Sequence, residues 1–317
     1  MRISTNQIFQ TGSRHLLQGQ SRLFKIQNQL GTGKKFLSAQ DDPVAAAQAL
    51  LTSQALGVNA QYADNQGNAS HQLALEEDRL KSVVESVLHI MEQTVAAGNA
   101  TYSDSQREFF AKELEHQFEF LLGAANSKDA NGYYLFSGYQ GHTRPFERVT
   151  GGTDPVAYRG DDGQRLMQVE SSRQIAVSDS GRDIFERNLT GNGTFALGAA
   201  SANTGTGVIG GGSVNDISAW LSGNGASYVI TFSTPTNYTI DTVPPSTAVP
   251  GTYTPGAAIT GISGISFSIS GEPAAGDTFT VEPSTEQSIF TTLQNLIKAF
   301  STDVEGNPVA RAEVQNI

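Results

Sequence analysis

The residue types that support metal binding or thiol chemistry are sparse in this chain. It has five histidines and no cysteine, which excludes thiolate nucleophiles, disulfides and cysteine-ligated metals. No histidine has a partner four residues away, the spacing at which two imidazoles on one helix face bind zinc. The histidines are His15, His71, His89, His116 and His142. We therefore predict no metal site and no cofactor.

Two pairs of adjacent aspartates are the candidates for acid–base work. Asp41 and Asp42 precede Pro43, and neighbouring side chains at a helix start point to different sides. We instead predict that Asp42 caps a helix whose first residue is Pro43, where the missing N–H costs nothing. Asp161 and Asp162 lie between two glycines, in a sequence typical of a turn, and the spacing of an EF-hand is absent.

Phosphate-loop and serine-hydrolase chemistry are also excluded. Residues 31–35 (GTGKK) lack the Gly-x-x-x-x-Gly-Lys-Ser/Thr spacing of a Walker motif. No Gly-x-Ser-x-Gly nucleophile elbow occurs. With no catalytic constellation, we predict that the chain is not an enzyme.

The first 40 residues form a basic leader with an apolar row. They contain six Lys or Arg and no Asp or Glu. An apolar residue recurs at every seventh position, which returns to one side of an α-helix. The row is Phe9, Leu16, Leu23, Leu30 and Leu37. A single narrow row finds nothing to pack on within its own segment, so it predicts an interface for assembly.

Charge and hydropathy exclude further classes of partner. The formal net charge is −11 although the leader is basic, so the rest of the chain is strongly acidic. Phosphate neutralisation by Lys and Arg dominates nucleic-acid affinity, and the leader's charges are dispersed and lack stacking aromatics. No stretch of about 18 apolar residues and no secretory signal is visible. We predict no nucleic-acid partner and no membrane partner.

The order of elements predicts an α+β fold. Long helices are expected over 43–97 and 103–128 and a shorter one over 289–300, because apolar residues recur there at helical spacing. These helices pack most economically as an elongated antiparallel bundle, a rod, with a small antiparallel β domain inserted. The packing stripe expected on the first helix is Leu73, Leu80, Val84, Val87, Met91 and Val95.

The inserted segment is rich in Ser, Thr and Gly and has no Lys or Arg between Asn188 and Ile297. Alternating apolar residues predict strands. These strands are expected at 228–232, 238–240, 265–269 and 278–281. Residues 160–163 (GDDG) predict a hairpin turn between strands at 156–158 and 166–169. A short helix is expected within 214–221, and the sole tryptophan, Trp220, is expected to pack.

Several motifs resemble the bacterial flagellin-like axial protein family. Residues 1–5 (MRIST), 30–35 (LGTGKK) and 38–47 (SAQDDPVAAA) resemble its N-terminal signature. Residues 131–139 (NGYYLFSGY) and 158–161 (YRGD) are similar to the branch that joins hook to filament, rather than to filament flagellin.

The resemblance implies a secreted structural component of the extracellular flagellum. Its partners would be hook-associated protein 1, flagellin, an export chaperone with the type III export apparatus, and further copies of itself in a ring. Residues 1–43 would be a terminal axial and export segment, disordered in the monomer. Residues 44–142 and 286–317 would form the rod, and 143–285 the outer β domain. The leader row would pack axially, and the surface at Asp41, Asp42 and Pro43 would contact neighbouring subunits.

One departure concerns the C-terminal end. The family ends in a long amphipathic helix, whereas this chain stops at Ile317, shortly after Pro308 opens a helix. We expect the leader's helical mate to be missing and the 317-residue chain to be monomeric.

Three alternatives remain open. A minor flagellin would form filament instead of a junction. A surface adhesin would use the Thr/Ser-rich β domain to hold glycan. An enzyme inserted in the β region would show turnover that one polar substitution abolishes.

Overall fold

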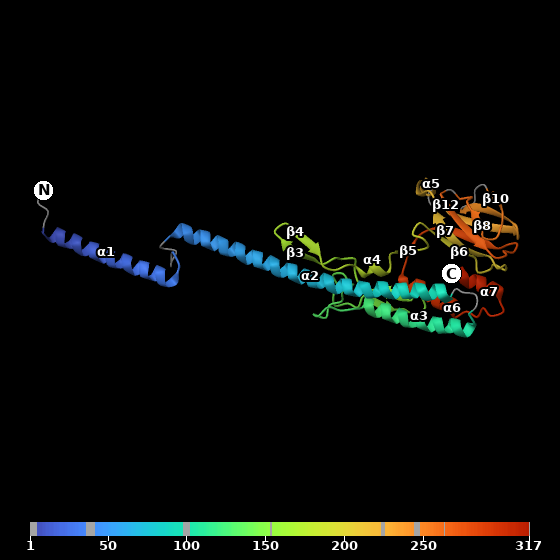
Figure 1. The fold of residues 1–317 in the computed structure, drawn as a ribbon, viewed down its shortest axis with the longest axis horizontal. Helices are drawn as coiled ribbons and strands as arrows, with labels where there is room; N and C mark the ends of the chain where they lie inside the picture. Colours follow the sequence, from blue (N-terminus) through green and yellow to red (C-terminus); the bar gives the residue numbers. More distant parts are fainter. Residues whose placement is uncertain are drawn as a thin grey trace. The chain divides into compact units, whose positions relative to one another are not determined.

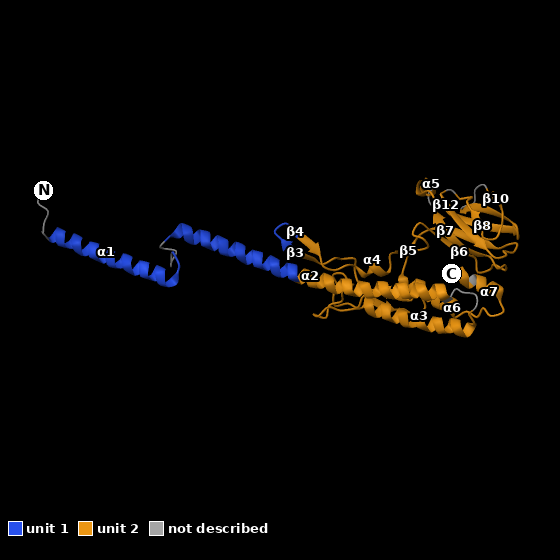
Figure 2. Ribbon diagram, viewed as in Figure 1, with its two compact units in different colours: residues 1–67, 168–173 blue, residues 68–167, 174–317 orange. Residues whose placement is uncertain are grey.

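The computed structural model describes residues 5–35, 42–97, 102–152, 154–222, 226–243, 248–262 and 264–316. The chain divides into two compact units. One contains residues 1–67 and 168–173, and the other contains residues 68–167 and 174–317 (Figure 2). Long helices and small antiparallel sheets make up the fold (Figure 1), which confirms the predicted α+β class.

The first unit is built from helix α1 (Thr5–Thr32) and the first part of helix α2 (Pro43–Ala97). Asp42 caps α2, since the backbone N–H of Ala45 donates to Asp42 Oδ1 at 3.0 Å. The predicted start of this helix at Pro43 and its end near Ala97 are thus confirmed. Disorder of the leader before assembly stays a prediction. Among the described residues, no helix is long and apolar enough to cross a membrane.

The second unit holds two separate apolar cores. The first, the helix core, joins the second half of α2 to helices α3 (Asp104–Ala125), α4 (Gly181–Phe185) and α6 (Ile289–Phe300). Strands β1 (Phe146–Arg148) and β2 (Val156–Tyr158), which pair antiparallel, also contribute to it. Its largest buried side chains include Leu114, Phe118, Leu121, Phe136, Phe146, Phe185 and Phe290. The expected β segment 143–285 therefore supplies part of the helix core.

Helix α3 begins and ends on side-chain caps. Ser103 and Gln106 form a capping box at its start, which satisfies N–H groups that the first turn leaves free. At its end, the Asn126 side chain accepts from the backbone N–H of Phe146 and donates to the Phe146 carbonyl, each at 3.0 Å. These two hydrogen bonds resemble those that a neighbouring strand would make, and they hold the start of β1 against the end of α3. The helix ends at Ala125, three residues before the predicted end.

The buried face of α2 in the second unit differs from the predicted stripe. Leu80 and Val87 do pack on the helix core, but Val84 and Val95 are 56% and 80% exposed. Four of the residues that α2 buries recur at spacings of seven, namely Ala69, Glu76, Val83 and Ile90, and Ser86 is buried as well. This face was not recognisable from apolar periodicity, because one of its positions is a carboxylate and another a small alanine. Neighbouring helix positions differ by about 100°, so a shift of one residue selects another face.

Glu76 anchors α2 to the loop that precedes α4. Its Oε1 accepts the backbone N–H of Asp179 at 3.0 Å, and the side chain is buried. Burial has the largest effect on the Glu76 carboxyl and raises its pKa. The hydrogen bond from the Asp179 N–H comes next and lowers the pKa, while the Asp179 charge raises it and Arg165 lowers it, so that the pKa lies above its ordinary value. The folded state therefore binds this proton more tightly than the unfolded state does.

We expect the free energy of unfolding to depend on pH through Glu76, and we expect Glu76→Gln to remove this contribution. Because the folded pKa lies above the ordinary value, the wild type gains unfolding free energy relative to the variant as pH falls through the folded pKa. The gain levels off below the ordinary pKa of a glutamate. Urea unfolding of both proteins from pH 7 to pH 4 measures this, and parallel curves over that range would refute it. Gln keeps the acceptor oxygen, so the comparison isolates the charge.

The predicted hairpin at residues 160–163 is wrong. Strand β2 pairs with β1, and strand β3 (Leu166–Glu170) pairs with β4 (Arg173–Ala176). The turn instead docks on the loop after residue 136, where Asp161 Oδ1 accepts the backbone N–H groups of Tyr139 and Gly163 at 2.9 and 2.8 Å. The Tyr158 hydroxyl donates to backbone carbonyls of this junction, including that of Asp161 at 2.8 Å. A carboxylate bridging two loops replaces the tight turn that the GDDG sequence suggested.

The second core, the β core, lies between two antiparallel sheets. A five-stranded sheet has the order β10 (Val249–Thr252), β9 (Asn237–Val243), β8 (Ser227–Thr234), β13 (Thr278–Pro283) and β6 (Phe195–Ala199). A three-stranded sheet has the order β11 (Ala258–Ile259), β12 (Ile265–Ser270) and β7 (Val208–Val214). Alternate residues such as Ile230 and Phe232 are buried, as half-buried strands require. All four predicted strands are confirmed.

The remaining elements connect or cover these cores. The predicted short helix is α5 (Ile217–Ser222), and Trp220 packs against Phe195 with ring centroids 5.8 Å apart, as expected. Strands β5 (Asn188–Leu189) and β14 (Glu286–Gln287) pair with each other. Helix α7 (Pro308–Gln315) begins at the predicted proline.

Candidate assembly interface

Four of the five leader-row residues lie on α1, and all four are exposed. Phe9 and Leu30 are 78% and 85% exposed, and Leu16 and Leu23 are also largely exposed. Leu37 falls outside the described residues, as does Asp41. Burying one such side chain is worth about 1.5–3 kcal/mol, so the row is a strong driving force for association.

The apolar surface of α1 is wider than a single row. Ile8, Leu17, Phe24 and Ile26 are each at least 60% exposed as well. Leu17 and Phe24 are seven residues apart, and each directly follows a residue of the first row. This second repeat was visible in the sequence and would have predicted the wider apolar surface. A helix with two adjacent apolar rows can contact more than one neighbouring helix.

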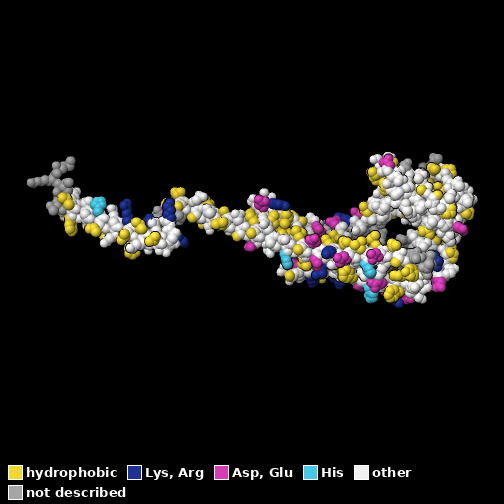
Figure 3. Space-filling view, in the orientation of Figure 1, with side chains coloured by type: hydrophobic (Ala, Val, Ile, Leu, Met, Phe, Trp, Pro, Cys, Tyr) yellow, Lys and Arg dark blue, Asp and Glu magenta, His cyan; other side chains and the backbone are white. Residues whose placement is uncertain are grey.

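The charges on α1 are of one sign. Arg14, Arg22 and Lys25 lie within it, and no Asp or Glu does. On the face drawn in Figure 3, the α1 segment shows hydrophobic and basic side chains, whereas acidic side chains gather on the helices of the second unit. A partner for α1 would therefore be a helix with an apolar stripe and neutral or acidic flanks.

The structure gives Asp42 and Pro43 a local role at the start of α2. Asp42 is half-buried and serves as the cap described above, while Pro43 is exposed. Apolar exposure continues beyond them, because Val44, Leu50, Leu51 and Leu56 are each at least 60% exposed. The start of α2 therefore extends the apolar surface of the first unit, and a subunit contact by Asp42 or Pro43 stays a prediction.

The groups considered for catalysis are used structurally. Among the described residues, no group of three or more His, Asp or Glu could hold a metal ion. Asp161 binds backbone N–H groups, and Asp162 lies 3.3 Å from Arg182 and 3.4 Å from Arg187. These contacts satisfy both carboxylates within the fold. The described residues of the first unit offer an exposed apolar surface for association.

Comparisons with known sequences find similarity to proteins of the bacterial flagellum. The family model for the bacterial flagellin N-terminal helical region matches residues 3–141. The flagellar hook-associated protein 3 of Salmonella typhimurium is 36% identical over 192 residues, 61% of this chain. The chain spans 59% of the length of the curated relatives it matches.

Solved structures extend the likeness over most of the chain. The flagellar junction protein FlgL from Legionella pneumophila matches with a TM-score of 0.76 at 31% identity, over 87% of this chain and 85% of that one. FlgL from Xanthomonas campestris matches with a TM-score of 0.76 at 30% identity, over 83% of each chain. Both matches cover much more of the chain than the leader and the first helices alone.

Proposed function

Because this chain belongs to the family of flagellar hook-associated protein 3, also called FlgL, we propose that it is a structural component of the flagellum that joins the hook to the filament. The observation that carries this proposal is the exposed double apolar row on α1, together with the named relatives. A junction needs surfaces that associate, and the described residues offer such a surface and no reaction centre. The minor flagellin, the adhesin and the inserted enzyme gain no support from these observations.

The finer assignments form part of the same proposal. The partners would be hook-associated protein 1 on the hook side, flagellin on the filament side, and further copies of this chain in a ring. An export chaperone and the type III export apparatus would bring it to the extracellular flagellum. Residues 1–43 would pack axially, residues 44–142 and 286–317 would form the rod, and residues 143–285 the outer domain.

The test is Leu23→Asp combined with Leu30→Asp, introduced into the protein in flagellated cells that lack any other copy. A charge placed in a buried apolar row costs several kcal/mol, so we expect the protein to be exported but filaments to be absent. Electron microscopy counts filaments per cell, and immunoblots of the medium measure export.

The matched control is Thr11→Asp combined with Gln18→Asp. These exposed residues have the same spacing of seven and lie on the side of α1 opposite both apolar rows, so they add the same charge without entering either row. Normal filaments are expected for this pair. Normal filaments for the Leu23/Leu30 pair would reject the interface, and normal filaments in cells without the protein would reject the junction function itself.

A further inference from the structure

The two cores of the second unit are joined by few residues. The helix core and the β core have no buried residue in common. The chain passes from one to the other after Phe185 and returns before Phe290. At both passages it runs through the short pair of strands β5 and β14, which we call the ribbon. The position of the β core relative to the helix core therefore depends on the ribbon and on whatever else touches both.

The ribbon is narrow and carries little burial. Each strand has two residues, and Leu189 is 57% exposed. Hydrogen bonds continue the pairing toward the β core. The Thr190 N–H donates to the Thr285 carbonyl at 3.0 Å, and Ser284 donates its hydroxyl to the Thr190 carbonyl at 2.6 Å and its N–H to the Thr194 carbonyl at 3.1 Å. Arg187 and Glu286 form an ion pair across the ribbon at 3.8 Å, between side chains that are 40% and 62% exposed. A two-stranded ribbon without a packed face is marginally stable and bends easily.

Helix α7 supplies a second connection. On one side it is tied to the helix core, because the preceding Val304 is buried and its N–H donates to Asp104 Oδ1 of α3 at 2.9 Å. Asn307 then caps the helix through the N–H of Ala310 at 3.1 Å. On the other side, α7 contacts β7 and the loop between β6 and β7.

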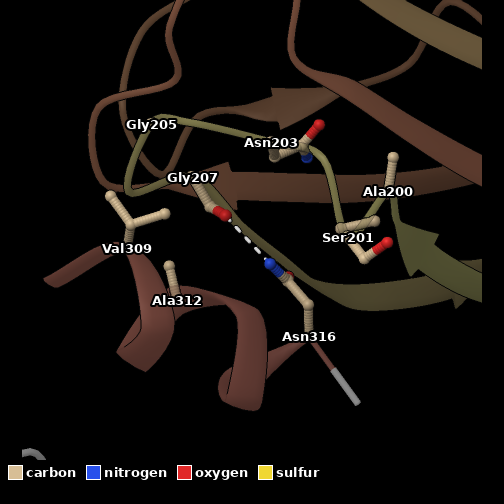
Figure 4. A pocket seen from close by; sticks show the side chains of 9 residues that line it. Ala200, Ser201, Asn203, Gly205, Gly207, Val309, Ala312 and Asn316 are labelled. Atoms are coloured by element: carbon tan, nitrogen blue, oxygen red, sulfur yellow. Dashed lines mark hydrogen bonds between the residues drawn. The ribbon is translucent and has the colours of Figure 1, made fainter. Parts of the chain in front are cut away.

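The contact with the β core centres on Asn316, just after α7. Its Oδ1 accepts the backbone N–H of Ile209 at 2.8 Å, and its Nδ2 donates to the Gly207 carbonyl at 3.0 Å. The amide thereby occupies the edge of β7 as a neighbouring strand residue would. Figure 4 shows the bond from Asn316 to the Gly207 carbonyl, beside a cavity of about 190 Å³ that Val309 and Ala312 of α7 help to line. Packing there is incomplete, so the amide provides much of the specificity of this contact.

From this geometry we propose that α7 and Asn316 form a strap that fixes the orientation of the β core on the helix core. When the strap is detached, the β core turns about the β5/β14 ribbon. Two hydrogen bonds and a small apolar contact hold the strap, so a single substitution in this contact is enough to release the β core. This device goes beyond the proposed function and does not depend on it.

The absence of cysteine allows a direct test by site-specific spin labelling of the full chain. Glu115→Cys on α3 and Ala275→Cys on the β core place two labels at exposed positions, one on each body. Double electron–electron resonance measures the distribution of distances between them. We expect a narrow distribution in the parent and at least a twofold broader one after Asn316→Ala. Ala312→Glu, which puts a charge into the strap contact, should broaden it in the same way.

The matched control is Tyr253→Phe. It removes a buried hydroxyl that donates to the Gly271 carbonyl at 2.7 Å within the β core, and Tyr253 does not line the cavity beside α7. Its loss should leave the distance distribution narrow, and circular dichroism verifies that each variant is folded. Narrow distributions in both strap variants would overturn the proposal. Equal broadening in Tyr253→Phe would also overturn it, because loosening of the β core would then explain the result.

Discussion

Replacing Phe290 with alanine is expected to lower the free energy of unfolding of the second unit by about 3–5 kcal/mol. Phe290 has no exposed surface and lies at the start of α6. Its ring contacts those of Phe118, Phe146 and Phe185, with centroids 5.5, 5.6 and 6.0 Å apart. One side chain thus holds together α3, β1, α4 and α6, and its removal leaves a cavity that these four elements cannot all close.

Urea unfolding followed by far-ultraviolet circular dichroism measures this loss. The matched control is Phe109→Ala, because Phe109 lies on α3 and is 69% exposed. We expect it to change the free energy of unfolding by about 0.5 kcal/mol or less, as is usual for surface substitutions. A loss for Phe290→Ala no larger than that of the control would show that the four elements do not share one core.

The same core shows what periodicity in a sequence can and cannot predict. The start of α2 was predictable because Asp42 and Pro43 are local signals, and the strands of the β core were predictable because alternation is local too. The placement of Phe146 and Phe185 in the helix core was not. These residues lie in a segment of short strands and turns, and only contacts distant in the sequence decide which core they join.

The candidate interface was predictable to a similar extent. The row Phe9, Leu16, Leu23 and Leu30 stood out because nothing nearby in the sequence covers it, and all four side chains are exposed. The second row was missed because the prediction followed only one position in each repeat of seven, which spans about two helical turns. The buried face of α2 was misplaced for a different reason. Glu76 contributes a carboxylate to it, and a carboxylate is buried only when a distant backbone N–H, here that of Asp179, is available.

The loop of residues 134–139, part of the motif that resembled the junction branch, has a structural explanation, and it leads to a second large effect. Gly138 has a φ of +68°, in the left-handed region that favours glycine. A Cβ at this position would overlap both the side-chain Oδ1 and the carbonyl oxygen of Asp161. The Asp161 carboxylate would then have to move away from the backbone N–H of Tyr139, which it accepts at 2.9 Å.

Gly138→Ala should therefore destabilise the second unit far more than its conformational strain alone requires. The matched control is Gly132→Ala, where φ is +83° but no atom lies within 4 Å of the added Cβ. We expect Gly138→Ala to cost at least about 2 kcal/mol more than the control, because overpacking costs ~1–3 kcal/mol and each lost hydrogen bond ~0.5–1.5 kcal/mol. Urea unfolding gives the two free energies, and hydrogen exchange at the amides of Tyr139 and Gly163 reports on the carboxylate bridge. Equal losses in the two variants, with both amides still protected, would mean that Asp161 does not hold the two loops together.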